Sequence, residues 1–362
     1  MLYYLLYPLK DLWFGFNVFR YITFRAAMAS ITAFALSVLI GPIIIRKLSR
    51  MKIGESPRKE HVEGLYELHK HKEGTPTMGG IVIILAMLIC TLLWARLDNP
   101  FIILCLISVL WLGIVGFIDD YIKLIKLKSL GLSAAAKFTG QLILGIGVAL
   151  YLYFNPDFST AFYVPFLKHA LFNLGALYIL FIVLVIVGTS NAVNITDGLD
   201  GLAIGCVCFI AFSYSIISYL TGHLDFSGYL NIYYLAGSGE LTVFCATIVG
   251  AGMGFLWFNS YPATIFMGDT GSLPLGGAIG IVSVLIKKEI LLLIVGGIFV
   301  AEVLSVIMQV ASFRLYRKRI FLMAPLHHHL QLLGWPEPKI TVRFWIVGVL
   351  LALFGLATLK LM

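Results

Sequence analysis

Two adjacent carboxylates, Asp119 and Asp120, stand at the end of a long apolar run and precede Tyr121. Neighbouring acids repel each other and lose hydration at a membrane boundary, and a carboxylate at the C-terminal end of a helix opposes the helix dipole. A divalent metal ion would neutralise them. Because adjacent helical side chains point about 100° apart, one carboxylate could bind the metal while the other faces a second task. The alternative is a pair of helix-end acids at the headgroup level without a catalytic role.

A second polar cluster spans residues 188–201, GTSNAVNITDGLDG, between two apolar runs. Its glycines permit a tight backbone path, and the apolar run that follows predicts a helix beginning there. The backbone N–H groups at a helix N-terminus suit an anion or another hydrogen-bonding ligand. The oxygen spacing and the missing terminal Glu exclude an EF-hand loop. A turn capped by Asp and Asn side chains, without a ligand, is the alternative.

A third cluster, residues 257–272, contains one acid, Asp269, and no Lys or Arg. Asp269 has no basic neighbour in the sequence, so its partner is either a distant residue or a metal ion. Phe266 lies three residues before it, and an aromatic ring there could stack on a nucleobase. For each aromatic residue of this cluster the alternative is an anchor at the membrane interface.

Three consecutive histidines begin at His327, after a basic segment at residues 314–319. On a regular helix they fan around the axis and cannot all bind one ion, which disfavours a zinc site. Contact of one or two of them with a phosphate or with substrate is the favoured interpretation. A fifth patch, residues 70–80, combines Lys70 and Lys72 with a Gly-rich entry to the next apolar run.

The elements that carry these groups must be membrane helices. Of the 362 residues, 60% are hydrophobic and only 12% are charged, which is too apolar for a soluble globular protein and excludes a disordered chain. The five cysteines lie in or beside apolar runs and are expected to be small hydrophobic residues. Because no basic segment precedes the first apolar stretch, we expect no cleaved signal peptide. The chain is interpreted as one polytopic membrane domain, residues 1–362.

A spanning helix needs about 20 mostly apolar residues, and we predict an all-α integral membrane protein with about ten transmembrane helices. The segment 272–286 is short and contains Pro274, and only Lys287 and Lys288 separate it from the next span. The candidate spans are 21–45, 78–95, 101–118, 136–154, 172–190, 201–221, 241–258, 272–286, 289–312 and 341–361.

The basic residues assign the two sides of the membrane. Of the 26 Lys and Arg residues, 18 belong to the loops and flanks that follow the odd-numbered spans, so those loops are predicted to be cytoplasmic. Both termini then lie on the outer, periplasmic side. All five chemical clusters fall on the cytoplasmic face, which is therefore the predicted active-site face. A nucleic-acid partner is not expected, because no soluble basic domain is available to bind one.

With these clusters in this order, the chain resembles the bacterial phospho-N-acetylmuramoyl-pentapeptide transferases, of the polyprenyl-phosphate N-acetylhexosamine phosphate transferase superfamily. The resemblance runs from end to end, and the histidine run with WPEP points to the muramoyl branch. Ile195 and Thr270 are conservative variations on the usual pattern. The segments that carry it are FNV at 16–18, TPTMGG at 75–80, DDY at 119–121, NAVNITDGLDG at 191–201, FMGD at 266–269, PLHHH at 325–329 and WPEP at 335–338.

The resemblance implies a reaction and its partners. Undecaprenyl phosphate would attack the sugar-linked phosphate of UDP-N-acetylmuramoyl-pentapeptide, releasing UMP and leaving lipid I in the membrane. This is the first membrane step of peptidoglycan synthesis. The resemblance further implies dependence on Mg2+, a homodimer, and a multi-pass location in the bacterial cytoplasmic (inner) membrane.

By the same resemblance, Asp269 is the first choice as Mg2+ ligand with Asp120 as helper, and Asp119 is the candidate base toward the lipid phosphate. The second pKa of a phosphate monoester is about 6, so most of it is dianionic at pH 7 and a base contributes less than the metal. A two-step path with an Asp nucleophile stays open. His327 completes the predicted catalytic group. Glu302, an acid inside a predicted span, is either functional or a structural partner.

The resemblance also places the substrates, with the uracil stacked on the ring of Phe266. The predicted uridine contacts are Asp197, Gly198, Leu199, Asp200, Asn259 and Phe266. The predicted contacts of the diphosphate or the lipid phosphate are Lys72, Lys123 and Lys137. The residues expected to border the sugar or pyrophosphate are Gln309, His327 and His328. The remaining predicted substrate-binding residues are Thr77, Asn194 and His329.

Two other functions compete with this one. The first is a sister transferase that uses UDP-N-acetylglucosamine with the same lipid carrier, but such an enzyme should lack the PLHHH and WPEP pattern. The second is an ion-coupled transporter that uses the acids as an ion path. A transporter needs polar residues at mid-membrane and on both faces, whereas here they crowd one face, with Glu302 as the main exception.

Overall fold

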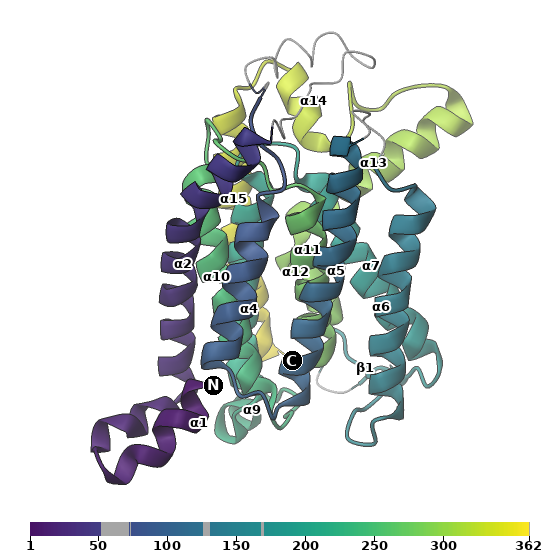
Figure 1. Ribbon diagram of the computed structural model, residues 1–362. Coiled ribbons are helices and arrows are strands. Elements are labelled where there is room, and N and C mark those ends of the chain that lie inside the picture. Colours follow the sequence, from purple (N-terminus) through teal and green to yellow (C-terminus); the bar gives the residue numbers. More distant parts are fainter. Residues whose placement is uncertain (52–71, 73, 126–130, 168–169, 362) are drawn as a thin grey trace.

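The computed structural model describes residues 1–51, 72, 74–125, 131–167 and 170–361. Lys70, named above in the basic patch, lies outside this part. The described chain is a bundle of long helices that run between two ends (Figure 1). The main helices are α2 (Ile22–Arg50), α4 (Gly80–Trp94), α5 (Pro100–Ile125), α6 (Ala134–Phe154), α7 (Leu177–Thr196), α8 (Leu202–Thr221), α10 (Leu241–Asn259), α11 (Asp269–Leu285), α12 (Glu289–Val295), α13 (Gly297–Tyr316) and α15 (Glu337–Ala357).

Each of the ten predicted spans falls on an apolar helix or helix pair. In the described part of the chain, eight helices are long and apolar enough to cross a membrane. The other two apolar helices, α4 and α11, are shorter, with 15 and 17 residues. The prediction of an all-α, multi-pass membrane protein is therefore confirmed.

Short helices and strands lie at the two ends of the bundle. Both chain termini lie at the end opposite to α14 (Figure 1). Strand β1 pairs with β2 in an antiparallel ribbon of two residues each. The short elements are α1 (Leu2–Leu6), η1 (Tyr7–Asp11), η2 (Phe14–Arg20), β1 (Ala161–Phe162), β2 (Phe172–Asn173), α9 (Leu224–Leu230), η4 (Ser238–Glu240), α14 (Leu326–Leu332) and η5 (Thr358–Leu361).

Helix α11 forms the centre of the bundle. All of its residues are buried, and it packs against α5 and α7. Pro274 lies inside it, close to the N-terminal end, and the helix continues past this residue to Leu285. A helix that is apolar on every side and buried on every side is one surrounded by other helices. The N-terminal residue of α11 is Asp269, so the central helix delivers this carboxylate to one end of the bundle.

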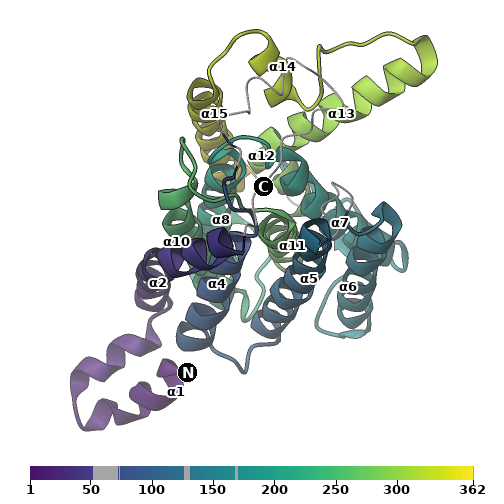
Figure 2. The ribbon, with the colours of Figure 1, turned by 45° about the horizontal axis from the view of Figure 1, so that its top comes forward.

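The ninth predicted span, 289–312, is not one helix. The chain forms α12, breaks at Gly296, and continues as α13, which leans out of the bundle (Figure 2). A pair of adjacent glycines is a common cause of a sharp kink. Gly297 also faces α15 closely, because a Cβ atom there would lie 2.8 Å from Leu351 Cδ1. The expectation of a continuous span was wrong, since periodic hydrophobicity alone does not reveal the Gly-Gly break.

Candidate active site

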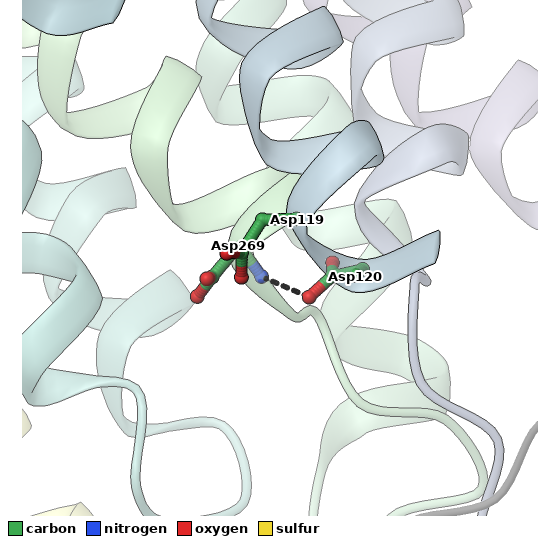
Figure 3. Close-up of side chains that lie close together, drawn as sticks. All are labelled: Asp119, Asp120 and Asp269. Carbon is green, nitrogen blue, oxygen red and sulfur yellow. Dashed lines mark hydrogen bonds between the residues drawn. The ribbon is translucent and has the colours of Figure 1, made fainter. Parts of the chain in front are cut away.

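Three buried aspartates meet at one end of the bundle. Asp119 and Asp120 lie near the end of α5, and Asp269 begins α11 (Figure 3). Carboxylate oxygens of the three side chains lie within 4.8 Å of one another. In the described part of the chain this is the only group of three or more such ligands close enough to share an ion. The structure therefore brings together the acids that the sequence places after two different spans.

The carboxylate of Asp120 caps the N-terminal end of α11. Its Oδ2 accepts hydrogen bonds from the N–H and the hydroxyl of Thr270 at 2.9 and 2.7 Å, and its Oδ1 accepts one from Asp269 N at 3.3 Å. The first N–H groups of a helix have no intrahelical partner, and a carboxylate satisfies them and complements the helix dipole. The capping residue here comes from a neighbouring helix, so Asp120 fixes α11 against α5.

Two glycines allow this close approach. Gly116 on α5 packs directly on α11, because a Cβ atom there would lie 2.2 Å from Asp269 O. Gly268 has φ of +71°, and a Cβ atom there would lie 2.6 Å from Asp120 Oδ2 and 3.1 Å from Thr77 Oγ1. A larger residue at either position would push the aspartates apart. Thr77, a predicted substrate contact, is thus placed beside Asp120.

Asp269 is held by two lysines and an amide. Its Oδ2 accepts from Lys137 Nζ at 2.6 Å and from Lys123 Nζ at 2.9 Å, and its Oδ1 accepts from Asn194 Nδ2 at 2.5 Å. Lys123 also lies 2.5 Å from Asp119 Oδ2 and so bridges the two carboxylates. The predicted contacts Lys123, Lys137 and Asn194 therefore converge on the acids. The two lysines mark where phosphate oxygens would find positive charge.

The two carboxylate oxygens of Asp119 have different surroundings. Its Oδ1 accepts a hydrogen bond from Leu132 N at 2.8 Å. Its Oδ2 lies near Lys123 but makes no hydrogen bond of normal geometry with any described residue, although it is buried. Mg2+ prefers oxygen ligands, and typically takes one or two carboxylates together with substrate phosphates. A cluster of carboxylate oxygens with one incompletely satisfied oxygen fits such an ion.

A second group of predicted residues forms around Lys72. Its ammonium donates to Asp200 Oδ1 and Glu337 Oε1, both at 2.6 Å, and lies 5.6 Å from the centre of the Phe266 ring. Burial lowers the pKa of Lys72, but the carboxylates of Glu337 and Asp200 outweigh this effect, so the pKa lies above its usual value. Lys72 therefore stays charged while it links these groups. Asn259 lies next to this group, because its Oδ1 accepts a 3.1 Å hydrogen bond from the N–H of Gly201, the residue after Asp200.

Backbone hydrogen bonds also join the TPTMGG segment to the FMGD segment. Phe266 N donates to Pro76 O, and Gly79 N donates to Phe266 O, both at 2.8 Å. The TPTMGG segment therefore holds the backbone of Phe266 in place. Asp197, Gly198 and Leu199 form the turn between α7 and α8, with Leu199 buried. Gly198 packs against the ring of His327.

The three histidines of α14 have different surroundings. His327 is fully buried against Glu302 on α13. His328 Nδ1 lies 2.9 Å from Gln331 Oε1, and His329 Nδ1 accepts from Leu322 N at 3.2 Å. Gln309 binds the backbone of the segment between α13 and α14, at Ile320 and Phe321. Gln309 and His329 therefore stabilise this segment.

Comparison with known proteins decides the family. The family model described as glycosyl transferase family 4 matches residues 101–287, and the phospho-N-acetylmuramoyl-pentapeptide-transferase signature 1 matches residues 72–84. The chain is 51% identical over 362 residues to the phospho-N-acetylmuramoyl-pentapeptide-transferase of Desulforapulum autotrophicum, and 52% identical over 361 residues to that of Citrifermentans bemidjiense. Both alignments cover 100% of each chain.

The chain belongs to the phospho-N-acetylmuramoyl-pentapeptide-transferase family. The resemblance inferred from the motifs is thus confirmed, and the protein is a transferase. In this phospho-N-acetylmuramoyl-pentapeptide-transferase family member, the matched signature contains Lys72 and Thr77. The longer match contains all three clustered aspartates.

Two acids of this family member were not assigned a role from the sequence. Glu337 belongs to the WPEP motif, yet nothing in the motif indicates its contact with Lys72, which lies 265 positions earlier in the sequence. Glu302 was recognised as an unusual acid in a span, but its partner was not. The signal available for Glu337 was its position as the one acid in a motif shared with the family.

Proposed function

We propose that the protein transfers phospho-N-acetylmuramoyl-pentapeptide from UDP-N-acetylmuramoyl-pentapeptide to undecaprenyl phosphate, giving lipid I and UMP. The observation that carries this proposal is the cluster of three buried aspartates, bridged by Lys123 and with Lys137 paired to Asp269, in a chain of this family. Phosphoryl transfer depends mainly on positioning and charge neutralisation, and the cluster offers groups of both signs for that purpose.

In this proposal Asp269 is the main Mg2+ ligand and Asp120 is its helper. When bound, the ion would neutralise charge on the phosphate oxygens of the donor. Asp120 Oδ1 supports the helper role, because its contacts with Asp269 N and Lys123 Nζ are long, at 3.3 and 3.4 Å. Lys137 and Lys123 would exchange their contacts with Asp269 for contacts with phosphate oxygens.

Asp119 is the proposed base toward the lipid phosphate. Support comes from its Oδ2, which is buried and lacks a normal hydrogen bond among the described residues. Its one close contact is the ion pair with Lys123, and that lysine would move toward the phosphate as Asp119 takes the proton. Because the acceptor phosphate is largely dianionic at pH 7, Asp119 would orient it as well as take its remaining proton.

The nucleotide would bind beside the group of residues around Lys72. Phe266 offers a ring face for the uracil, and Asp200 and Asn259 offer polar atoms beside it. Asp200 also accepts from Ala263 N at 2.9 Å, which ties the nucleotide turn to the loop that carries Phe266. His327 and His328 would border the sugar or the pyrophosphate.

We further propose ten membrane spans, with α4 and α11 counted as spans and with α12 and α13 together forming the ninth. The active site would then face the cytoplasm and both termini the periplasm, in the bacterial inner membrane. The arrangement of the basic residues supports this orientation. A homodimer, Mg2+ as cofactor and the surrounding lipid bilayer complete the proposal.

The decisive experiment measures UMP release by the purified full-length protein in detergent with undecaprenyl phosphate as acceptor. We expect release with UDP-N-acetylmuramoyl-pentapeptide and Mg2+, and only background release with UDP-N-acetylglucosamine. Equal or faster release with UDP-N-acetylglucosamine would identify the sister transferase instead. Ion flux in liposomes that persists in an Asp269→Ala variant, without UMP release by the native protein, would favour a transporter.

A further inference from the structure

Glu302 directs both of its carboxylate oxygens to one residue. It lies inside α13 and is completely buried, as is His327 on α14. Its Oε1 accepts from the backbone N–H of His327 at 3.2 Å, and its Oε2 lies 3.1 Å from Nδ1 of the same residue. A carboxylate that holds both the backbone and the ring of a histidine fixes the position and the rotation of that ring.

This contact also selects the protonated ring nitrogen. An ionised carboxylate only accepts hydrogen bonds, so Nδ1 must carry a proton to bind Oε2. The hydrogen bond at one ring nitrogen determines which form the other nitrogen takes. With the proton on Nδ1, the Nε2 atom of a neutral His327 is a hydrogen-bond acceptor. A buried acid performs the same task for the histidine of a Ser-His-Asp triad.

The accepting atom faces the turn between α7 and α8. His327 Nε2 is buried and has no hydrogen-bond partner among the described residues. A Cβ atom built on Gly198 would lie 2.3 Å from it, so the ring packs directly against this turn. Orphaned buried polar atoms are rare in folded proteins and each requires an explanation. The turn belongs to the proposed uridine site, since it is followed at once by Asp200.

We propose that Glu302 is a positioning residue that holds His327 with its proton on Nδ1, so that Nε2 accepts a hydrogen bond from a hydroxyl or amide N–H group of the nucleotide-sugar donor at the Gly198 turn. This inference rests on the proposed function, because it takes the nucleotide-sugar as the ligand. It assigns Glu302 a role in donor binding, beyond joining α13 to α14.

The first test observes the ring directly. Full-length protein labelled with 15N-histidine is studied in detergent by NMR, and the His327 signals are identified by their loss in His327→Asn. We expect the native protein to show a protonated Nδ1 and an unprotonated Nε2. In Glu302→Gln the amide donates to Nδ1, so the proton should move to Nε2. An unchanged protonation pattern in Glu302→Gln would overturn the proposal.

The second test uses the kinetics of UMP release. We expect Glu302→Gln to lower kcat/KM for the UDP-sugar by about 10- to 100-fold, as is usual when a group that orients a functional side chain is lost. In the double variant with His327→Asn, the loss should not exceed that of His327→Asn alone. Independent, multiplicative losses would show that Glu302 acts apart from His327 and would reject the proposal.

Two further variants guard against a simple folding defect. Gly198→Ala should displace the ring from the turn and reproduce the loss while Glu302 is intact, and normal kinetics in this variant would count against the proposal. Glu240→Gln removes a buried acid that pairs with Arg25 at 2.6 Å, apart from the site. It should leave the His327 signals and the UMP kinetics unchanged, and a similar effect would overturn the proposal. If the native protein shows the expected NMR pattern but no UMP release, the proposed function fails separately.

Discussion

The carboxylate of Asp120 caps a helix that it does not belong to, by accepting from both the backbone N–H and the hydroxyl of Thr270. Asp120 on α5 and Thr270 on α11 thus connect the two helices that carry the aspartate cluster. The neighbouring Asp119 makes no such contact and is bridged to Asp269 by Lys123. Two adjacent and identical side chains therefore have separable tasks.

Replacing the aspartates should separate these tasks. We expect Asp119→Asn, Asp120→Asn and Asp269→Asn each to reduce UMP release nearly to background. Asp120→Ala should in addition lower the free energy of unfolding by about 0.5–2 kcal/mol, the usual cost of a lost cap. Thermal unfolding in detergent measures this, with Asp119→Ala as the matched control. Equal stability of the two alanine variants would contradict the capping role, and full activity of any Asn variant would remove its assigned role.

Removal of the metal should stop the reaction reversibly. We expect chelation with EDTA to reduce UMP release to background and added Mg2+ to restore it. A ligand that binds only the folded state also raises its apparent stability. Mg2+ should therefore raise the melting temperature of the native protein, and this rise should disappear in Asp269→Asn. Retention of the whole Mg2+-dependent rise in that variant would show that the ion binds elsewhere.

Loss of the Phe266 ring should weaken donor binding more than catalysis. Stacking of a base on an aromatic side chain contributes about 1–3 kcal/mol, so Phe266→Ala should raise KM for the UDP-sugar roughly 5- to 150-fold with a smaller change in kcat. Trp257→Ala, which removes an exposed aromatic residue near the C-terminal end of α10, is the control. If both variants raise KM equally, the ring of Phe266 is an interfacial anchor and not a stacking platform.

The stability of the protein should depend on pH through Lys287, at the end of the bundle opposite to the aspartate cluster. Burial lowers the pKa of Lys287 to about 8, although the carboxylate of Glu289 raises it. Because the folded-state pKa lies below the unfolded value of 10.5, the folded state binds fewer protons between about pH 8 and 10.5. The contribution of Lys287 to stability should therefore rise with pH in this window, by up to roughly 3 kcal/mol.

The corresponding measurement compares native protein with Lys287→Met by thermal unfolding between pH 7 and 10. The Met variant has no ammonium to bury. The melting temperature of the variant minus that of the native protein should therefore be largest at pH 7. This difference should shift in favour of the native protein as pH rises through 8. A difference that is independent of pH would mean that Lys287 titrates normally.

Much of this arrangement could be predicted from the sequence, because a membrane allows few solutions. Apolar runs had to become helices, and the predicted segments did, except that the ninth divides into α12 and α13. Asp119 and Asp269 each adjoin a predicted cytoplasmic loop, so their convergence at one end followed from the order of the spans. The break at Gly296 did not follow, since α12 and α13 are both apolar and the kink depends on packing against α15.

The roles of individual acids were less accessible. Nothing in the local sequence distinguishes Asp119 from Asp120, because the difference lies in which way each side chain turns toward α11. The contact between Lys72 and Glu337 joins residues that are 265 positions apart in the sequence and exists only in the folded protein. Glu302 was visible as an anomaly in a span, but its partner depends on how α14 folds back over α13.

The short length of the two helices that begin beside the site has a consequence for the lipid substrate. At about 1.5 Å per residue, α4 and α11 extend for about 22 and 25 Å, less than the roughly 30 Å of hydrocarbon in a bilayer. We therefore expect the aspartate cluster to lie within the depth of the bilayer and not at its surface. Drawing a polyprenyl chain out of the membrane would cost about 0.8 kcal/mol for each exposed CH2 group. A site at that depth would avoid this cost. The water-soluble donor would approach the lipid phosphate there, while the polyprenyl tail stays in the hydrocarbon region of the bilayer.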